Sequence, residues 1–309
     1  RTISRFRSII MSELKHIPVL INEAIQGLAI RENGVYVDAT IGFGGYTELI
    51  AGQLGSGKVI GIDADKSALS LVQNRFTEQI TDGRLILKHS NFRFIEQVLA
   101  ELRISSVDGI IADLGLSSME LDDSSRGFSF KDDAPLDMRF DTSSDGLTAD
   151  TNINTYSQDE LANLFRDLGD EPFSGRIARV IVEARKKQAI TTTTELVNVI
   201  LSIVPSKFTK KSIHPATRVF QALRMEVNDE IGALNSLLSS SLNLLTSSGR
   251  LGIVSFHSGE DRIVKNIFRE WKAQGFVNIL TKKPITPSDI EIYANPRSRS
   301  AKLRIIEKI

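Results

Sequence analysis

The chain has 309 residues, of which 41% are hydrophobic, and its 38 basic and 38 acidic residues give a formal net charge of zero. A chain of this length and hydrophobicity can bury a full core, as one large domain or as one domain that carries a smaller second one. It has no cysteine, which excludes disulfide bonds, a thiolate nucleophile and cysteine-ligated zinc. No stretch approaches the roughly 18 apolar residues of a membrane span, so we expect no membrane partner.

The amino-terminal segment differs in composition from the rest of the chain. Residues 1–10 contain three arginines, two serines and no acidic residue, and Met11 follows them. Two interpretations compete: Met11 is the start, preceded by a translated remnant, or the segment is the end of an organellar presequence. We treat residues 1–15 as an N-terminal extension and leave them out of the fold prediction.

The next part of the chain alternates between strand and helix patterns. Apolar runs predict strands at 35–38, 58–63, 85–88 and 107–113, and helical spacing between them predicts helices at 47–54, 66–80 and 93–102. Such an order predicts a parallel sheet covered on both faces, with ligands bound at the carboxyl ends of its strands.

The alternation stops after residue 118 and later resumes. Residues 119–150 are acidic and poorly periodic, whereas the spacing of apolar residues predicts helices at 157–168, 174–188, 193–203, 215–229 and 230–246. A turn and buried strand at 249–256, a helix at 260–274 and a strand at 301–307 follow. We therefore predict an α/β domain formed by 16–122 and 211–309, with a small all-helical insertion at 123–210.

Charge is distributed unevenly along this predicted insertion. Between 105 and 160 there are three basic and 13 acidic residues, whereas between 172 and 226 there are ten basic and three acidic residues. A local basic face is the usual footprint of a phosphate-backbone contact. An ordinary solvated helix surface explains the same run of charge, and the charge alone does not decide between the two.

A glycine turn at 42–47 follows the first predicted strand, and Asp63 ends the second. Gly42, Gly44 and Gly45 let the backbone turn tightly against a ligand, and a carboxylate at the position of Asp63 can accept both hydroxyls of a ribose. The dinucleotide fingerprint requires Gly or Ala at its sixth position, where this chain has Thr47. The pattern therefore favours S-adenosylmethionine over NAD. An ordinary structural turn without a ligand would explain the three glycines taken alone.

Asp113 ends the fourth predicted strand, beside the predicted cofactor crevice, and residues 91–92 end the third. An exocyclic amine of a base is a poor nucleophile, and a carboxylate that accepts its N–H would localise the lone pair and stabilise the positive charge that develops. Asp113 is our candidate for this acceptor, assisted by the region of Ser117. In the alternative, Asp113 only holds the amino end of the cofactor.

Among the histidines, His257 has the most suggestive position, because it follows a buried strand at a carboxyl end. It either contacts the acceptor base or serves as a structural hydrogen-bonding group. His214 precedes a proline near a helix start, where a capping role is expected. The histidines and the acidic pairs at 122–123 and 132–133 lack metal-ligand spacing, so we predict no metal.

Taken together, these features resemble a known family. The segments that carry the resemblance are 16–20, 38–47, 113–118, 121–122, 126–130, 135–139, 214–224, 255–258 and 295–297. They resemble the RsmH (MraW) small-subunit rRNA cytosine-N4 methyltransferases, from about residue 16 to the C-terminus. The resemblance implies a class I (Rossmann-like) S-adenosylmethionine methyltransferase sheet with an inserted helical substrate-recognition domain. It also implies N4-methylation of a specific cytidine in the decoding centre (P site) of 16S rRNA.

The resemblance also assigns site residues. It implies cofactor contacts at Gly44, Gly45, Tyr46, Asp63, Phe92, Asp113 and Glu120, to which the glycine turn itself adds Gly42. The candidate catalytic residues remain those that the strand ends indicated, Asp113, Ser117 and His257. It implies substrate binding by Arg126, Arg139, Arg218, Arg224, Asn295, Arg297 and Arg299, although each arginine could equally pair with acids of the insertion. The chain departs from the family pattern at Tyr46 (usually His), Glu120 (usually Gln), Gly259 (usually Leu) and Asp170 (usually Glu).

The implied partner is 16S rRNA, either as naked RNA or within the 30S subunit, and a homodimer is left open. The implied location is a bacterial cytoplasm, with the mitochondrial matrix as the alternative if residues 1–10 belong to a presequence. Two other classes of function compete: a class I methyltransferase for DNA, protein or a small molecule, and a cofactor-binding regulatory or assembly protein without turnover. The target base would have to leave its stack to reach the methyl group.

Overall fold

The computed structural model describes residues 18–143, 145–203 and 214–309, so the predictions for residues 1–15 and 204–210 lie outside the described residues. The chain divides into two compact units, one formed by 1–115 and 232–309 and the other by 116–231. Each unit is described by itself below. No helix of the described segments has the length and apolarity that crossing a membrane requires.

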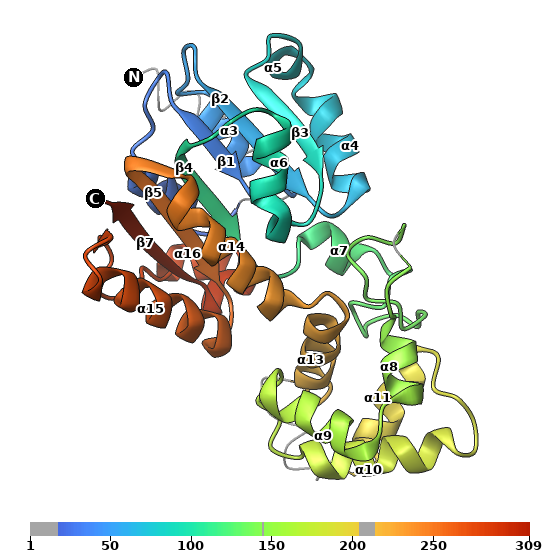
Figure 1. Ribbon diagram of the computed structural model, residues 1–309. Helices are drawn as coiled ribbons and strands as arrows, with labels where there is room; N and C mark the ends of the chain where they lie inside the picture. Colours follow the sequence, from blue (N-terminus) through green and yellow to red (C-terminus); the bar gives the residue numbers. More distant parts are fainter. Residues whose placement is uncertain (1–17, 144, 204–213) are drawn as a thin grey trace. The chain divides into compact units, whose positions relative to one another are not determined.

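The first unit is built on a seven-stranded sheet (Figure 1). Its strands are β1 (Val35–Asp38), β2 (Lys58–Asp63), β3 (Leu85–His89), β4 (Val107–Asp113), β5 (Leu245–Ser255), β6 (Val277–Ile279) and β7 (Lys302–Lys308). They lie in the order β3-β2-β1-β4-β5-β7-β6, in which β1 to β5 are parallel and β7 is antiparallel to both neighbours. The predicted class I α/β methyltransferase fold is confirmed.

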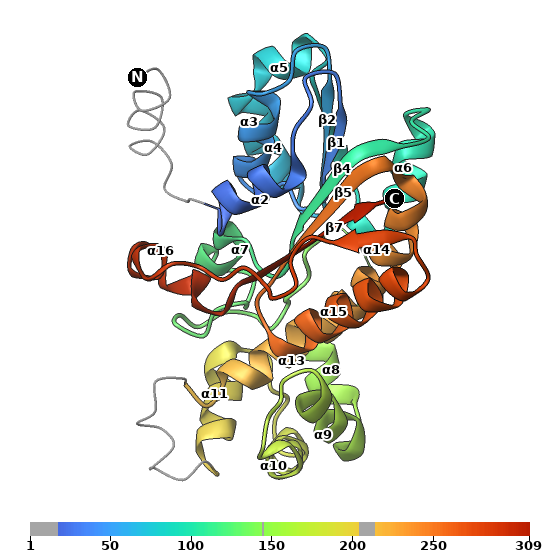
Figure 2. The same cartoon turned by 90° about the vertical axis from the view of Figure 1, so that its left-hand side faces the viewer.

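Helices cover both faces of this sheet (Figure 2). On one face α2 (Ile21–Leu28), α3 (Gly45–Ala51) and α4 (Lys66–Arg75) share a buried apolar cluster with the sheet. On the other face α6 (Ile95–Glu101), α14 (Glu230–Leu244) and α15 (Ser258–Ala273) share a second cluster. The strand order reverses between β1 and β4, and the crevice at such a reversal is the usual ligand site of an open α/β sheet.

The second unit is helical. It contains α7 (Ser118–Asp122), α8 (Ala149–Thr155), α9 (Gln158–Asp167), α10 (Ser174–Arg185), α11 (Thr193–Leu201), α13 (Thr217–Val227) and the first residues of α14. Fully buried side chains from several helices form its own core, including Ile153, Phe165 and Ile177. The predicted insertion at 123–210 lies inside this unit, and its role in substrate recognition stays a prediction.

Three features of the elements differ from the sequence prediction. The unit extends to Ile231, because α13 buries Val219 and Phe220 in the helical core rather than against the sheet. The predicted helix at 66–80 is two helices, α4 and α5 (Thr77–Thr81), since the chain breaks at the buried Phe76. Strand β5 begins at Leu245, ahead of the predicted turn. The predicted turn lies within β5, where the register of its pairing with β4 shifts between Val107 and Gly109.

Candidate functional site

The glycine turn lies between β1 and α3 and uses glycine for two different reasons. Gly42 and Gly44 adopt φ values of 49° and 79°, a region that L side chains rarely enter. A Cβ added to Gly44 would lie 2.8 Å from Phe76 Cε2, whereas one added to Gly42 would meet nothing closer than 4.0 Å. Gly45 is packed too tightly for a side chain, because its Cβ would lie 2.1 Å from Pro18 Cγ. The backbone of Gly42 therefore faces open space, where a ligand can approach.

Asp38 at the end of β1 organises this turn. Its fully buried carboxylate accepts a hydrogen bond of 2.7 Å from Thr47 Oγ1 at the start of α3. Thr40 Oγ1 in turn accepts the backbone N–H of Asp113 at 2.7 Å, which joins the ends of β1 and β4. Burial raises the pKa of Asp38 to about 6, and the hydrogen bond from Thr47 opposes this shift.

Asp63 at the end of β2 lies against the same turn. Its Oδ2 accepts the N–H of Gly42 at 2.9 Å, and its Oδ1 accepts the N–H of Asp65 at 2.8 Å. Burial raises the pKa of Asp63 to about 6, against the lowering effect of these two hydrogen bonds. The two bonds fix the carboxylate beside the glycine turn, as the sequence reasoning expected for a ribose acceptor.

Asp113 at the end of β4 has, within the described residues, the fewest side-chain hydrogen bonds of the three strand-end aspartates. Its Oδ1 is buried and has no hydrogen-bond partner among the described residues. Burial, followed by the charges of Asp38 and Glu260, raises the pKa of Asp113 well above its ordinary value. A buried oxygen without a partner costs free energy in the folded protein, so such an atom is a candidate for contact with a ligand.

Two predicted cofactor residues are packed into the protein. The Tyr46 side chain is 3% exposed, and its hydroxyl donates a hydrogen bond to the Val19 carbonyl oxygen. Burial raises the pKa of Tyr46 well above its ordinary value, so the phenol stays protonated. Phe92 begins the short helix η1 (Phe92–Phe94) after β3 and packs partly against the core. The hydroxyl of Tyr46 is thus used inside the protein, and the cofactor contact predicted for this residue stays a prediction.

His257 is the N-cap residue of α15. Its Nδ1 accepts the N–H groups of Gly259 and Glu260 at 3.2 and 3.4 Å. Its Nε2 lies 3.1 Å from Glu260 Oε1, without hydrogen-bond geometry. Nδ1 must be unprotonated to accept these two hydrogen bonds. His257 therefore has the geometry of a capping residue, which is the structural one of the two roles that the sequence left open.

Glu260 joins this cap from the other side. Its carboxylate is 2% exposed and accepts the N–H of Phe256 at 2.9 Å and that of His257 at 3.4 Å. The sequence reasoning missed both Glu260 and Asp38. Asp38 could have been found, because it ends a strand just as Asp63 and Asp113 do. Glu260 gave no such signal, because it lies inside a helix.

In the helical unit, Ser117 and Glu120 form a capping box at the start of α7. Ser117 Oγ accepts the N–H of Glu120 at 3.2 Å, and Glu120 Oε2 accepts the N–H of Ser117 at 2.7 Å. A glutamate or a glutamine at this helix position can serve in such a box. The departure at Glu120 is therefore compatible with the local structure, and the catalytic and cofactor roles predicted for these two residues stay predictions.

Three predicted substrate arginines have partners within the helical unit. Arg139 binds Asp137 through two bonds of 2.7 and 2.8 Å, and Arg224 binds Glu230 through two bonds of 2.6 and 2.9 Å. Arg126 donates to the carbonyl oxygens of residues 139 and 140 at 2.7 Å each. For Arg139 the structure shows an ion pair with an acid of the predicted insertion, the alternative to phosphate binding that the sequence left open. Arg224 is also paired, but its partner Glu230 lies outside the predicted insertion at 123–210.

The remaining predicted substrate residues are more accessible. Arg218 lies half-buried in the first turn of α13. Asn295 caps the short helix η2 (Pro296–Ser300) by accepting the N–H of Arg297 at 3.2 Å, and Arg297 and Arg299 are exposed. Within the described segments, no group of three or more histidine and acidic side chains is placed to hold a metal ion.

Comparison with known proteins places the chain in a family. Residues 13–309 match the MraW methylase family. The "Ribosomal RNA small subunit methyltransferase H" of Clostridium botulinum strain Loch Maree is 46% identical, over 96% of this chain and all of that protein. The protein of that name from Limosilactobacillus fermentum is 41% identical, over 97% of this chain and all of that protein.

Among solved structures, an rRNA methylase from Streptococcus thermophilus is 13% identical, with a TM-score of 0.44, and the match covers 95% of this chain and 99% of that one. The family match spans nearly the whole chain. The chain therefore belongs to the MraW methylase family, a family of S-adenosylmethionine-dependent methyltransferases.

Proposed function

We propose that this protein transfers a methyl group from S-adenosylmethionine to N4 of one cytidine in the decoding centre (P site) of 16S rRNA. The curated relatives that match nearly the whole chain carry the name of a small-subunit rRNA methyltransferase. The observation that carries the chemical part of the proposal is the buried Oδ1 of Asp113 at the reversal of strand order, which has no partner among the described residues.

The residues of the first unit fit the cofactor. Gly42 offers an open backbone, and Asp63 offers a fixed carboxylate with lone pairs left for ribose hydroxyls. Gly44, Gly45 and Phe92 shape the same end of the sheet. When bound, S-adenosylmethionine supplies an electrophilic methyl group and leaves as a neutral thioether.

Asp113 is the proposed proton acceptor. As a carboxylate it accepts a hydrogen bond from the N4 amine, which localises the lone pair of the nitrogen for attack on the methyl carbon. As the new N–C bond forms, the amine gives one proton to Asp113, so the methylated cytosine leaves neutral. The raised pKa of Asp113 makes its carboxylate a stronger base than an ordinary aspartate. His257 and Glu260 hold the start of α15 and, through the charge of Glu260, tune Asp113.

The RNA substrate requires further contacts. A base within folded RNA must leave its stack before its N4 can be methylated, at a cost of a few kcal/mol. Arg218, Arg297 and Arg299 are the accessible cations among the predicted substrate residues, and we assign the phosphate contacts to them first. The relatives are bacterial, so we propose a bacterial cytoplasm as the place of action.

The proposal is tested by methyl transfer from labelled S-adenosylmethionine to small ribosomal subunits from a strain that lacks the corresponding enzyme. Digestion of the product to nucleosides, followed by mass spectrometry, should show the label in N4-methylcytidine. Label in another nucleoside would contradict the N4 assignment. Cofactor binding without transfer would favour another acceptor or a non-catalytic role.

A further inference from the structure

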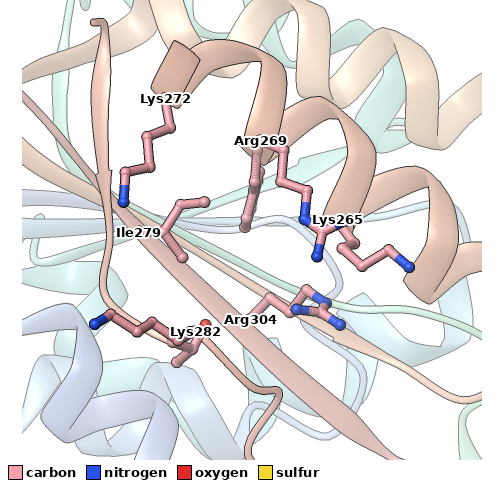
Figure 3. Close-up of a pocket in the computed structure, with 8 residues that line it drawn as sticks. Lys265, Arg269, Lys272, Ile279, Lys282 and Arg304 are labelled. Atoms are coloured by element: carbon pink, nitrogen blue, oxygen red, sulfur yellow. The ribbon is translucent and has the colours of Figure 1, made fainter.

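A second candidate site lies in the first unit, where α15 faces β6, β7 and the chain between them. It is a cavity of about 230 Å³. Five cationic side chains line it, and Figure 3 shows three of them along α15 and two across from that helix. They are Lys265, Arg269, Lys272, Lys282 and Arg304. Among the described residues, no acidic side chain lines the cavity.

Most of this positive charge is not neutralised by the protein. Arg304 is 7% exposed and is held by Asp261, with bonds of 2.6 and 3.3 Å. The other four cations form no ion pair within the described residues. Gathering like charges around one hollow costs electrostatic free energy, and a bound anion would relieve that cost.

The other lining residues offer little to a ligand except apolar surface. Phe268 and Ile279 provide apolar walls. The hydroxyl of Thr281 is used by the backbone of β7, since it accepts the N–H of Ile305 at 2.9 Å. A base or sugar is normally recognised through polar groups that read its edges or hydroxyls. The cavity therefore suits phosphate groups rather than a whole nucleotide.

The spacing of the cations favours a chain of phosphates over a single one. Lys265, Arg269 and Lys272 follow one another at intervals of four and three residues, which places them on one face of α15. At a rise of about 1.5 Å per residue, they extend over about 10 Å of helix. Successive phosphates of a polynucleotide match this spread of charge along the helix better than a single phosphate does.

We propose that this basic cavity binds the phosphodiester backbone of RNA, apart from the methyl-transfer crevice and without reading sequence. The inference rests on the proposed function for the identity of that RNA as small-subunit rRNA. Contact with phosphates here adds affinity and helps to orient the subunit on the enzyme. Arg304, held by Asp261, forms the fixed inner part of the site, and the exposed Arg269, Lys272 and Lys282 form its rim.

The test uses a charge reversal on the rim, Arg269→Glu with Lys272→Glu, because both side chains are exposed and their replacement should leave the fold intact. The matched control is Arg103→Glu with Arg262→Glu, which reverses two exposed cations of the same unit that form no ion pair among the described residues and do not line the cavity. Binding to unmethylated small subunits and to a single-stranded 16S rRNA fragment is measured without methyl donor, between about 50 and 200 mM salt.

We expect the rim variant to bind both RNAs at least about tenfold more weakly at low salt than the control does. The slope of log affinity against log salt should fall by about 1.4 on the single strand, because two phosphates are no longer neutralised. Equal affinity and equal slope in the rim variant and the control would overturn the proposal. A second result would also overturn the proposal: inorganic pyrophosphate binds the wild type but not the rim variant, while the two proteins bind RNA equally well. The cavity would then be a site for small anions.

Because binding is measured without turnover, the two proposals fail separately. RNA binding that depends on the rim, in a protein that makes no N4-methylcytidine, would leave the cavity proposal standing and remove the proposed function. Normal methylation, together with RNA binding that is unchanged in the rim variant, would leave the proposed function standing and remove the cavity proposal.

Discussion

Asp113 of the sheet unit and two arginines of the helical unit are used in opposite ways. At the strand ends of the sheet unit, Asp113 keeps a buried oxygen without a partner among the described residues. In the helical unit, Arg139 and Arg224 are engaged by Asp137 and Glu230. Folding rarely leaves a buried polar atom unpaired without a reason, whereas a paired arginine is explained by its own ion pair. The comparison separates groups held ready for a ligand from groups that stabilise the protein.

The largest expected effect is that of Asp113→Asn on catalysis. The amide cannot accept a proton from the N4 amine, so kcat should fall by about 10² to 10⁴. The fold should persist, because removal of a buried unpartnered carboxylate relieves a cost. Single-turnover methyl transfer and thermal unfolding measure the two effects. In the wild type, kcat should rise with pH as Asp113 ionises, with a midpoint well above the ordinary pKa of aspartate. A variant with the wild-type rate would remove Asp113 from the mechanism.

Two arginines of the same helix, α13, sharpen the comparison. Arg224→Ala leaves Glu230 buried without its partner and should lower the free energy of unfolding by about 3 kcal/mol. Arg218→Ala breaks no ion pair among the described residues and should change stability by about 0.5 kcal/mol or less. Arg218→Ala should instead raise the KM for the small subunit. Denaturant unfolding measures the stability of the two variants, and steady-state kinetics measures their KM. A loss of stability in Arg218→Ala and a raised KM in Arg224→Ala would reverse the roles assigned to the two arginines.

Asp63 tests the cofactor half of the sheet unit. Asp63→Ala removes the proposed acceptor of the ribose hydroxyls, and the Kd for S-adenosylmethionine should rise about 10- to 100-fold, as expected for hydrogen bonds to a charged group. Protonation of Asp63 should weaken cofactor binding as the substitution does, so the wild-type Kd should rise as the pH falls through about 6. Calorimetric titration with the non-reactive product S-adenosylhomocysteine measures both. An unchanged Kd in the variant would place the cofactor elsewhere.

The smallest effect concerns His257. His257→Ala loses the cap of α15 and should cost about 1 kcal/mol of stability, whereas His257→Asn keeps a good capping group and should cost less. If the role is capping, the asparagine variant retains methyl transfer to within a few-fold. A folded asparagine variant with activity reduced by about 100-fold would instead assign His257 a part in catalysis.

The sheet was readable from the sequence because its strands are buried apolar runs between helices. β1, β2 and β4 match the predicted bounds, and the residues at their ends meet as a parallel sheet requires. The short elements β6 and α16 (Asp289–Ala294) were missed, since each is too short to show a period. Helix α2 was missed as well, although its buried Ala24, Ile25 and Leu28 follow a helical spacing.

The site was only partly readable. The positions of Asp63 and Asp113 follow from the rule that strand ends carry ligands. The pairing of Arg224 with Glu230 does not, because it depends on how α13 meets α14. The Tyr46 hydroxyl bonds to the Val19 carbonyl oxygen, and this contact depends on the path of the chain near Val19. The sequence around Tyr46 does not predict that path. The basic cavity on α15 was missed because its cations come from one helix and from two later segments.

The central claim is that this chain methylates one decoding-centre cytidine, and its most direct test is the position of the product. Unmethylated small subunits are treated with the purified protein and S-adenosylmethionine, and the 16S rRNA is cut into oligonucleotides that are sequenced by mass spectrometry. We expect one N4-methylcytidine, in the fragment that contains the P site, and none after treatment with Asp113→Asn. A methyl group on another nucleotide, or no methyl group from a protein that binds the cofactor, would contradict the account.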